Sequence, residues 1–415
     1  MTRYLQERTL FGPLIAAAPT SELGLVVVIP ARDEEGSLLQ ALGSLVDCEL
    51  PADCSVEVIV VVNTSEADSP DDVARNVRSA EIAREWAVAH SSERLHFHVL
   101  EAHNLPRKHA GVGLARKIGM DEACRRLESV GHPRGVIGCY DADSACDPNY
   151  LVELEALFRR DEKCQACSIY FEHPLEGDEF SPEIYDAIIH YELHLRTYIN
   201  AQKWVGFPFA TQTIGSSMAV RCDAYQAQNG MNKRQAGEDF YFLHKYTPLG
   251  QVAELTSTRV IPSPRESHRV PFGTGKAVGE LLESGERCLT YSPESFLDLR
   301  SFFEGLDDWW ENADAGTTEL PESVRTFLDA QSFAERIAEI RANATSLPAF
   351  RTRFFKWFNA FLVMKFLHHS RDGYHPDVDV TQAARWLLEQ RGEVAPDSAR
   401  ELLLRWREID RGTNG

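Results

Sequence analysis

A chain of 415 residues with 43% hydrophobic and 26% charged residues has the composition of an ordinary globular protein, long enough for one large domain and a smaller partner. The formal net charge of -20 argues against nucleic acid as the main partner, because phosphate binding needs a basic surface. No run of eighteen or more apolar residues occurs, so we expect no transmembrane span. The first twenty residues lack the pattern of a secretory signal, and the nine cysteines form an odd set. We therefore expect a cytoplasmic protein, with contact to the inner face of the membrane left open.

Apolar runs in the first two-thirds of the chain predict buried strands. They lie at residues 25–29, 56–62, 95–100, 135–140 and 166–171. Continuous rather than alternating runs indicate a sheet that is covered on both faces. Helical patterns separate these runs, at residues 35–46, 71–90, 112–128 and 149–159. The order predicts a doubly wound, mostly parallel α/β sheet, in which ligands bind at the carboxyl ends of the strands.

The pattern changes near residue 285, after which the sequence predicts helices and no strand. The predicted helices lie at residues 321–343, 351–369, 380–391 and 398–409. We therefore expect three parts: an N-terminal extension (1–21), an α/β domain (22–280) and a helical C-terminal region (285–415).

The strongest candidate for a chemical site is Asp141-Ala142-Asp143, directly after the predicted strand 135–140. Two carboxylates at the exposed end of a buried strand form a hard-oxygen site that suits Mg²⁺ or Mn²⁺. A metal there binds the two phosphates of a nucleotide diphosphate and stabilises the charge of the leaving group. The alternative is a simple turn, since Asp and Ser often follow strands for local hydrogen bonding.

Four further motifs accompany the aspartate pair, and together they point to a family. In chain order the five segments are 28–35 (VIPARDEE), 58–65 (VIVVVNTS), 111–119 (GVGLARKIG), 141–144 (DADS) and 237–240 (GEDF). This order and spacing resembles family 2 glycosyltransferases of the GT-A fold, over about residues 22–275. The resemblance implies a divalent-metal-dependent, inverting transfer of sugar from a nucleotide diphosphate sugar to a hydroxyl acceptor. Mn²⁺ or Mg²⁺ would be the cofactor, and the acceptor is left open.

The resemblance also implies the residues that bind the nucleotide sugar. They are Pro30, Arg32, Glu34, Asn63, Arg116, Lys117, Asp141 and Asp143. Arg32 stands where the family usually has an aromatic residue, and the planar guanidinium can still stack on a base. Asn63 stands where an Asp commonly contacts the base, and its amide offers both a donor and an acceptor. For Arg116 and Lys117 the alternative is a solvated helix face.

The same resemblance implies the residues of the chemical step. Asp239 would be the general base toward the acceptor hydroxyl, with Glu238 as the next candidate. Asp143, Asp141 and His268 would bind the metal, with Asp143 as the main ligand. The alternatives are that Asp239 only stabilises a helix N-terminus and that His268 is an ordinary exposed side chain.

Two aromatic segments have two interpretations each. Residues 207–217 lie where the family forms its acceptor cleft, and their rings would stack on a sugar or pack in a core. Residues 351–367 are rich in aromatic and basic side chains, which favours burial between helices over a membrane surface.

Three alternative functions stay open: a retaining GT-A glycosyltransferase, a sugar-phosphate nucleotidyltransferase, and a catalytically dead binding protein. A nucleotidyltransferase would need a Lys-containing glycine-rich loop, and residues 30–36 contain no Lys. The intact acidic residues argue against a dead protein.

Overall fold

The computed structural model describes residues 2–267, 273–312 and 316–412, and these form two compact units. Of the described residues, the first unit contains 2–180, 213–267, 273–279 and 410–412, and the second contains 181–212, 280–312 and 316–409. Residues 181–212 therefore belong with the C-terminal helices, whereas the boundaries expected from the sequence include them in the α/β domain.

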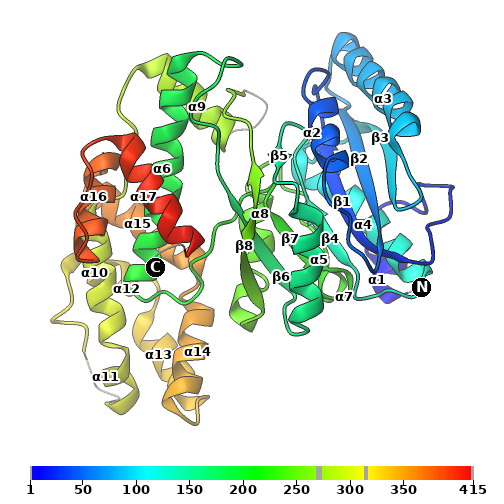
Figure 1. Cartoon of the computed structure of the whole chain (residues 1–415). Helices are drawn as coiled ribbons and strands as arrows, with labels where there is room; N and C mark the ends of the chain where they lie inside the picture. The colour runs from blue at the N-terminus through cyan, green and yellow to red at the C-terminus, as the bar shows by residue number, and fades with distance from the viewer. Residues whose placement is uncertain (1, 268–272, 313–315, 413–415) are drawn as a thin grey trace. The chain divides into compact units, whose positions relative to one another are not determined.

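The first unit is built on an eight-stranded sheet with the order β3-β2-β1-β4-β7-β6-β8-β5 (Figure 1). The strands are β1 (Leu23–Ala31), β2 (Ser55–Ser65), β3 (Leu95–Leu105), β4 (Val136–Cys139), β5 (Ala145–Cys146), β6 (Ala166–Phe171), β7 (Met218–Arg221) and β8 (Val252–Ile261). The pairs β2·β3, β1·β2, β1·β4 and β6·β8 are parallel. Strand β7 is antiparallel to β4 and β6, and β5 is antiparallel to β8. The predicted mostly parallel sheet is confirmed.

Alternate side chains of the central strands enter two separate cores, one on each face of the sheet. On β1, Val27 belongs to one core and Val28 to the other, and both are fully buried. Strand β2 behaves in the same way, because Val60 and Val61 divide between the same two cores. This explains the continuous apolar runs, since a strand that is covered on both faces has no solvent side.

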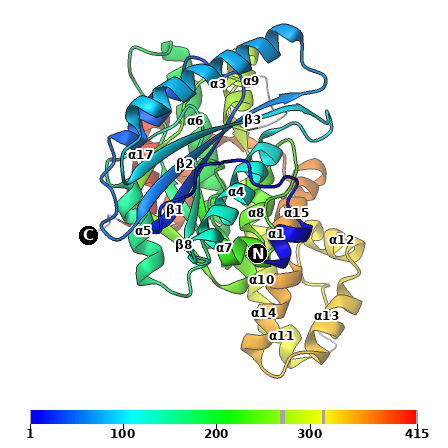
Figure 2. The same cartoon turned by 90° about the vertical axis from the view of Figure 1, so that its right-hand side faces the viewer.

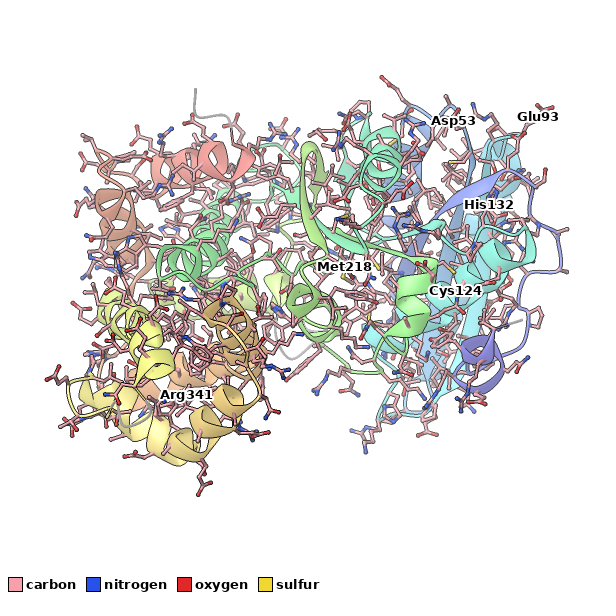
Figure 3. All side chains as sticks on the ribbon, turned by 90° about the horizontal axis from the view of Figure 1, so that it is seen from below. Asp53, Glu93, Cys124, His132, Met218 and Arg341 are labelled. Atoms are coloured by element: carbon pink, nitrogen blue, oxygen red, sulfur yellow. The ribbon has the colours of Figure 1, made fainter. Side chains whose placement is uncertain are left out.

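Helices cover both faces of this sheet. The helices of the first unit are α1 (Arg3–Glu7), α2 (Leu38–Val46), α3 (Pro70–His90), α4 (Val112–Ser129), α5 (Tyr150–Arg160), α7 (Cys222–Ala227) and α8 (Glu238–Leu243), with a short 3-10 turn at Thr247–Leu249. Figure 2 shows α3 lying along β2 and β3. In Figure 3, Cys124 of α4 and Met218 of β7 lie in this unit, and both side chains belong to the core on the α4 face.

The second unit is helical apart from one short strand pair, β9 (Leu289–Thr290) with β10 (Val378–Asp379). Its helices are α6 (Pro182–Trp204), α10 (Pro293–Glu304), α11 (Leu306–Glu311), α12 (Glu322–Ala330), α13 (Phe333–Ala342), α14 (Leu347–Trp357), α15 (Ala360–Gly373), α16 (Val380–Gln390) and α17 (Ala399–Arg411); the division between the units falls within α9 (Thr274–Ser284). Two predicted helices are each split in two. Ser332 separates α12 from α13 with a left-handed φ of 52°, and Asn359 starts α15 by accepting from the amide of Phe361 at 3.0 Å.

Aromatic rings form the core of the second unit. Phe354, Phe358 and Phe366 are at most 1% exposed, which confirms the predicted burial of the aromatic segment. Phe207 is also buried, with its ring against those of Phe303 and Phe355, so packing rather than sugar stacking accounts for it. In the part of the chain that the structure describes, no helix is both long and apolar enough to cross a bilayer.

Candidate active site

The aspartate pair lies at the carboxyl end of β4, near the middle of the sheet. The backbone amide of Tyr140 still donates to the carbonyl of Val28 on β1, after which the chain leaves the sheet through Asp141, Ala142 and Asp143. The side chains of Asp141 and Asp143 are 35% and 22% exposed. Each of the two carboxylates is paired with an arginine from a different part of the chain.

Arg116 connects the aspartate pair to the second acidic motif. Its guanidinium donates to Asp141 through one nitrogen and to Glu238 through the other. The side chains of Arg116 and Glu238 are only 2% and 3% exposed, so their ion pair is shielded from water, whereas Asp141 keeps one side in solvent. The Nε atom of Arg116 is buried and has no partner within the described chain. Arg116 therefore fixes the distance between two motifs that are far apart in sequence.

A glycine makes room for this arginine. A Cβ atom at Gly215 would lie 2.6 Å from Nη1 and 2.7 Å from Nη2 of Arg116, which is closer than real Cβ contacts. Any side chain at Gly215 would therefore push the guanidinium away from its carboxylates. Gly215 belongs to the segment that the sequence assigned to the acceptor cleft, and its observed role is to let Arg116 enter.

The second acidic motif starts the short helix α8. Gly237 precedes it with a left-handed φ of 67°, a conformation that glycine adopts without strain. Glu238 is buried, and Asp239 is partly exposed and accepts a hydrogen bond from the amide of Phe240 at 2.7 Å. Burial, followed by the charge of Glu238, raises the pKa of Asp239 to about 7. A carboxylate with this pKa can take up a proton near neutral pH.

Arg265 pairs with the other carboxylate of the aspartate pair. Its Nε donates to Oδ2 of Asp143 at 2.7 Å, and its Nη2 lies 2.5 Å from Oε1 and 2.7 Å from Oε2 of Glu34. Ser37 donates to the same Glu34 carboxylate at 2.6 Å. Burial raises the pKa of Asp143 to about 6; the charge of Arg265 lowers this pKa, and the charges of Glu34 and Asp141 raise it. The sequence predicted Glu34 and Asp143 as site residues, and Arg265, which flanks His268, as a side chain that could hold a phosphate; the pairing of Arg265 with both carboxylates appears only in the structure.

The loop that contains the predicted nucleotide-sugar residues Arg32 and Glu34 follows strand β1, and the third predicted residue, Pro30, lies within β1 itself. Arg32 donates to the carbonyl of Ala110 at 3.0 Å and to Asp68 at 2.5 Å, and its side chain remains 37% exposed. Both contacts are made by the terminal nitrogens of the guanidinium group, Nη1 and Nη2. Asn63 is 2% exposed near the end of β2, and its Nδ2 donor is buried with no acceptor among the described residues.

The structure separates Lys117 from the other predicted site residues. Its ammonium lies 2.9 Å from a carboxylate oxygen of Asp121 and 2.9 Å from the hydroxyl of Tyr4, on a buried side of α4. Tyr225 donates to the same Asp121 at 2.8 Å. Lys117 therefore attaches the N-terminal helix α1 to α4. Adjacent residues on a helix point about 100° apart, and here Arg116 contacts Asp141 and Glu238, whereas Lys117 contacts Asp121 and Tyr4.

His268 lies outside the described residues, so its role as a metal ligand stays a prediction. Among the described residues, those of this site included, no group of three or more His, Cys, Asp or Glu side chains is arranged to hold a metal ion. The donor chemistry nevertheless fits a divalent cation, because the carboxylates of Asp143 and Glu34 both contact one cationic group, the guanidinium of Arg265, at 2.5–2.7 Å. Magnesium sites in particular use one or two carboxylates together with substrate phosphates and water.

Residues 26–222 match the model of the family described as glycosyl transferase family 2. The match includes the aspartate pair and Arg116, and it ends before Glu238 and Asp239. Over this segment, somewhat less than half of the chain, the protein is similar to family 2 glycosyltransferases. The match supports a glycosyltransferase enzyme that takes its sugar from a nucleotide sugar. A comparison with curated proteins gives no match.

Solved structures that align with the chain do so at low similarity. Staphylococcus aureus TarS 1-349 is 12% identical, with a TM-score of 0.38, and the alignment covers 94% of this chain and 91% of that one. The same protein in complex with UDP gives 11% identity and a TM-score of 0.40, over 89% of this chain and 92% of that one. The mannosyltransferase PcManGT from Pyrobaculum calidifontis, in complex with GDP-Man and Mn²⁺, is 13% identical with a TM-score of 0.33, over 99% and 91% of the two chains.

Proposed function

We propose that this enzyme transfers a sugar from a nucleotide diphosphate sugar to a hydroxyl acceptor, with inversion and with help from a divalent cation. The observation that carries the proposal is that one buried side chain, Arg116, joins Asp141 of the aspartate pair to Glu238 of the second acidic motif. A metal-binding motif and a candidate base are thereby held on one rigid support. Sugar transfer needs this combination, because the leaving diphosphate and the attacking hydroxyl are both at the anomeric carbon.

Asp239 is the proposed general base. Direct displacement requires a group that removes the acceptor's proton on the face opposite the leaving nucleotide. Its pKa near 7 allows Asp239 to accept that proton during the reaction and to release it afterwards. Glu238 is less suited to the task, because its carboxylate is already paired with Arg116.

Asp143 and Asp141 are the proposed cation ligands, with diphosphate oxygens and water completing the shell. A bound Mn²⁺ or Mg²⁺ would supply Lewis-acid stabilisation of the departing diphosphate. The protein's own contribution is orientation, since Arg116 holds Asp141 and the end of β4 holds Asp143. In the nucleotide loop, Asn63 has an unsatisfied buried donor that an acceptor atom of the base would satisfy.

The experiment is a screen of nucleotide sugars for donor hydrolysis with and without Mn²⁺, together with calorimetry of UDP and GDP binding. We expect at least one nucleotide to bind more tightly with Mn²⁺, and we expect Asp143→Ala to remove this gain. Asp147→Ala is the matched control, because Asp147 lies four residues further along and pairs with Arg259 at 3.0 Å. Equal nucleotide affinity with and without metal in the wild type would refute the metal site. A nucleotidyltransferase would instead release pyrophosphate from a nucleoside triphosphate and a sugar phosphate.

A further inference from the structure

Two arginines neutralise the aspartate pair, but they differ in how firmly they are held. Arg116 is 2% exposed and is enclosed by Gly215, so it cannot leave Asp141 without disturbing the core. The side chain of Arg265 is 27% exposed and lies on a loop that follows the last residue of β8. Of the two arginines, only Arg265, the partner of Asp143, can therefore leave its carboxylate and be replaced by another cation.

We propose that Arg265 occupies the place of the divalent cation in the nucleotide-free enzyme, and that the metal–nucleotide complex must displace it from Asp143. The inference rests on the proposed function, and it adds a residue that the candidate site did not assign. In the absence of nucleotide, the guanidinium keeps Asp143 and Glu34 neutralised, and free cations bind poorly. The cation enters efficiently only when a diphosphate brings further oxygen ligands.

The contacts of Arg265 support this competition. One guanidinium contacts both Asp143 and Glu34 at 2.5–2.7 Å, and a divalent cation would need the same carboxylate oxygens. Nε and Nη2 of Arg265 both contact Oδ2 of Asp143 at 2.7 Å, so a cation that binds this oxygen must displace the guanidinium, whereas Arg116 contacts Oδ1 of Asp141 and not Oδ2. The displaced arginine has a natural new partner, because its planar fork binds phosphate oxygens in the same way as carboxylate oxygens.

The backbone around Arg265 allows this exchange without unfolding the site. Pro262 and Pro264 are buried on either side of Ser263, and they fix the path of the chain as it leaves β8. The amide of Arg265 donates to the hydroxyl of Ser263 at 3.3 Å, so the start of the loop has its own support. The side chain can therefore rotate away from Asp143 while its backbone stays in place.

A neighbouring arginine provides a matched control. Arg259 on β8 also joins two carboxylates, with 3.0 Å to Asp147 and 2.6 Å to Glu172, and its side chain is 31% exposed. Removal of Arg259 takes a positive charge away from two carboxylates, as removal of Arg265 does. If the loss of any positive charge were enough to tighten cation binding, Arg265→Ala and Arg259→Ala would therefore both show the gain.

The test is the affinity for Mn²⁺ alone, measured from the electron paramagnetic resonance signal of free Mn²⁺, with no nucleotide present. Arg265→Ala should bind Mn²⁺ at least about tenfold more tightly than the wild type, since a charge-assisted hydrogen bond no longer competes. Arg265→Lys keeps the charge and should stay near the wild type, as should Arg259→Ala. The double variant Arg265→Ala/Asp143→Asn should lose the gain. Thermal midpoints in EDTA check that each variant is folded.

Unchanged Mn²⁺ affinity in a folded Arg265→Ala variant overturns the inference, and so does an equal gain in Arg259→Ala. Tighter binding that persists in the double variant also overturns it, because the cation would then not use Asp143. The proposed function has a separate test, since it fails if wild-type protein binds no nucleoside diphosphate in a metal-dependent way. The Mn²⁺ measurement needs no nucleotide, so the two failures are distinguishable.

Discussion

Replacement of Asp239 by Asn removes a proton acceptor while it retains the shape of the side chain. In the structure, Oδ1 of Asp239 accepts from the amide of Phe240 at 2.7 Å, and the amide oxygen of Asn can accept the same bond. The proposed donor-binding residues, such as Asp143 and Arg32, lie on other loops, so donor binding should survive. Transfer to the acceptor should fall about 10²–10⁴-fold, the usual contribution of a general base.

The pH dependence of the wild type follows from the raised pKa of Asp239. A base with a pKa of about 7 is protonated and inactive below that pH, so kcat should rise about tenfold per pH unit up to neutrality and then level off. The measurement needs a saturating concentration of donor. Asp143, a proposed cation ligand, has a pKa of about 6, so its titration would change donor binding in a neighbouring pH range. The residual activity of Asp239→Asn should show no rise near pH 7.

The stability of the folded protein gives an independent readout of the pKa of Asp239. The contribution of Asp239 to stability falls as the pH rises, whereas kcat rises. The pKa of Asp239 is higher in the folded state than the unfolded value near 3.9, so the folded state binds the proton more tightly. The contribution of Asp239 to stability is therefore greatest at low pH and is lost as the pH rises through about 7. At pH 8, the Asn variant should have a thermal midpoint equal to or above that of the wild type.

Asp71→Asn is the matched control, because Asp71 is an exposed residue in the first turn of α3, as Asp239 is in the first turn of α8. It should change neither transfer nor donor affinity. Full transfer activity in Asp239→Asn would remove Asp239 from the mechanism and leave Glu238 as the next candidate. Loss of donor binding together with activity would mean that the acidic motif organises the site and does not take the proton.

Two further predictions test the support of the site and the second unit. Arg116→Met leaves the buried carboxylate of Glu238 without its partner and also removes the partner of the partly exposed Asp141, so we expect a loss of about 3–5 kcal/mol in the free energy of unfolding, measured by urea denaturation; a loss below about 1 kcal/mol would show that the bridge has little structural weight. Phe302→Ala removes a ring that is 1% exposed, with neighbouring centroids at 5.1–5.8 Å, and should cost about 3–5 kcal/mol by the same measurement without a change in nucleotide affinity of the folded protein. Exposed Phe361 is the control for the second variant, and an equal loss in Phe361→Ala would contradict the assigned core.

The sequence predicted the parts of the fold that depend on local pattern. The continuous apolar runs became β1, β2 and β6, because side chains on both faces of these strands are buried and leave no polar alternation. Strands β5, β7 and β8 were missed, and the short pair β9 and β10 shows that the expectation of no strand after residue 285 was wrong. The four residues of β7 are too few to show a period, and β8 alternates between buried and exposed positions. The long helix α6 was not predicted either, and its assignment to the second unit depends on contacts with α16 that are distant in sequence.

For the site, the sequence by itself determined which residue types are present and in which motifs they occur. The sequence predicted Asp141, Asp143, Glu34 and Asp239 from the order and spacing of five motifs that resemble family 2 glycosyltransferases, because a carboxylate at a strand end or a helix start alone also fits a turn or a helix N-terminus. Lys117 was wrongly grouped with them, because adjacency in sequence says nothing about which way a helical side chain points.

Only the tertiary structure decided how the charges pair. Arg116 and Glu238 are 122 residues apart, and Arg265 and Glu34 are 231 residues apart. No local pattern encodes such pairs, because an arginine's partner depends on where the sheet brings the loops together. The need for glycine at position 215 also appears only when the guanidinium of Arg116 is in place against it. The sequence therefore determined the chemistry available to this protein, whereas long-range packing decided which carboxylates are held fixed and which one is left open to exchange.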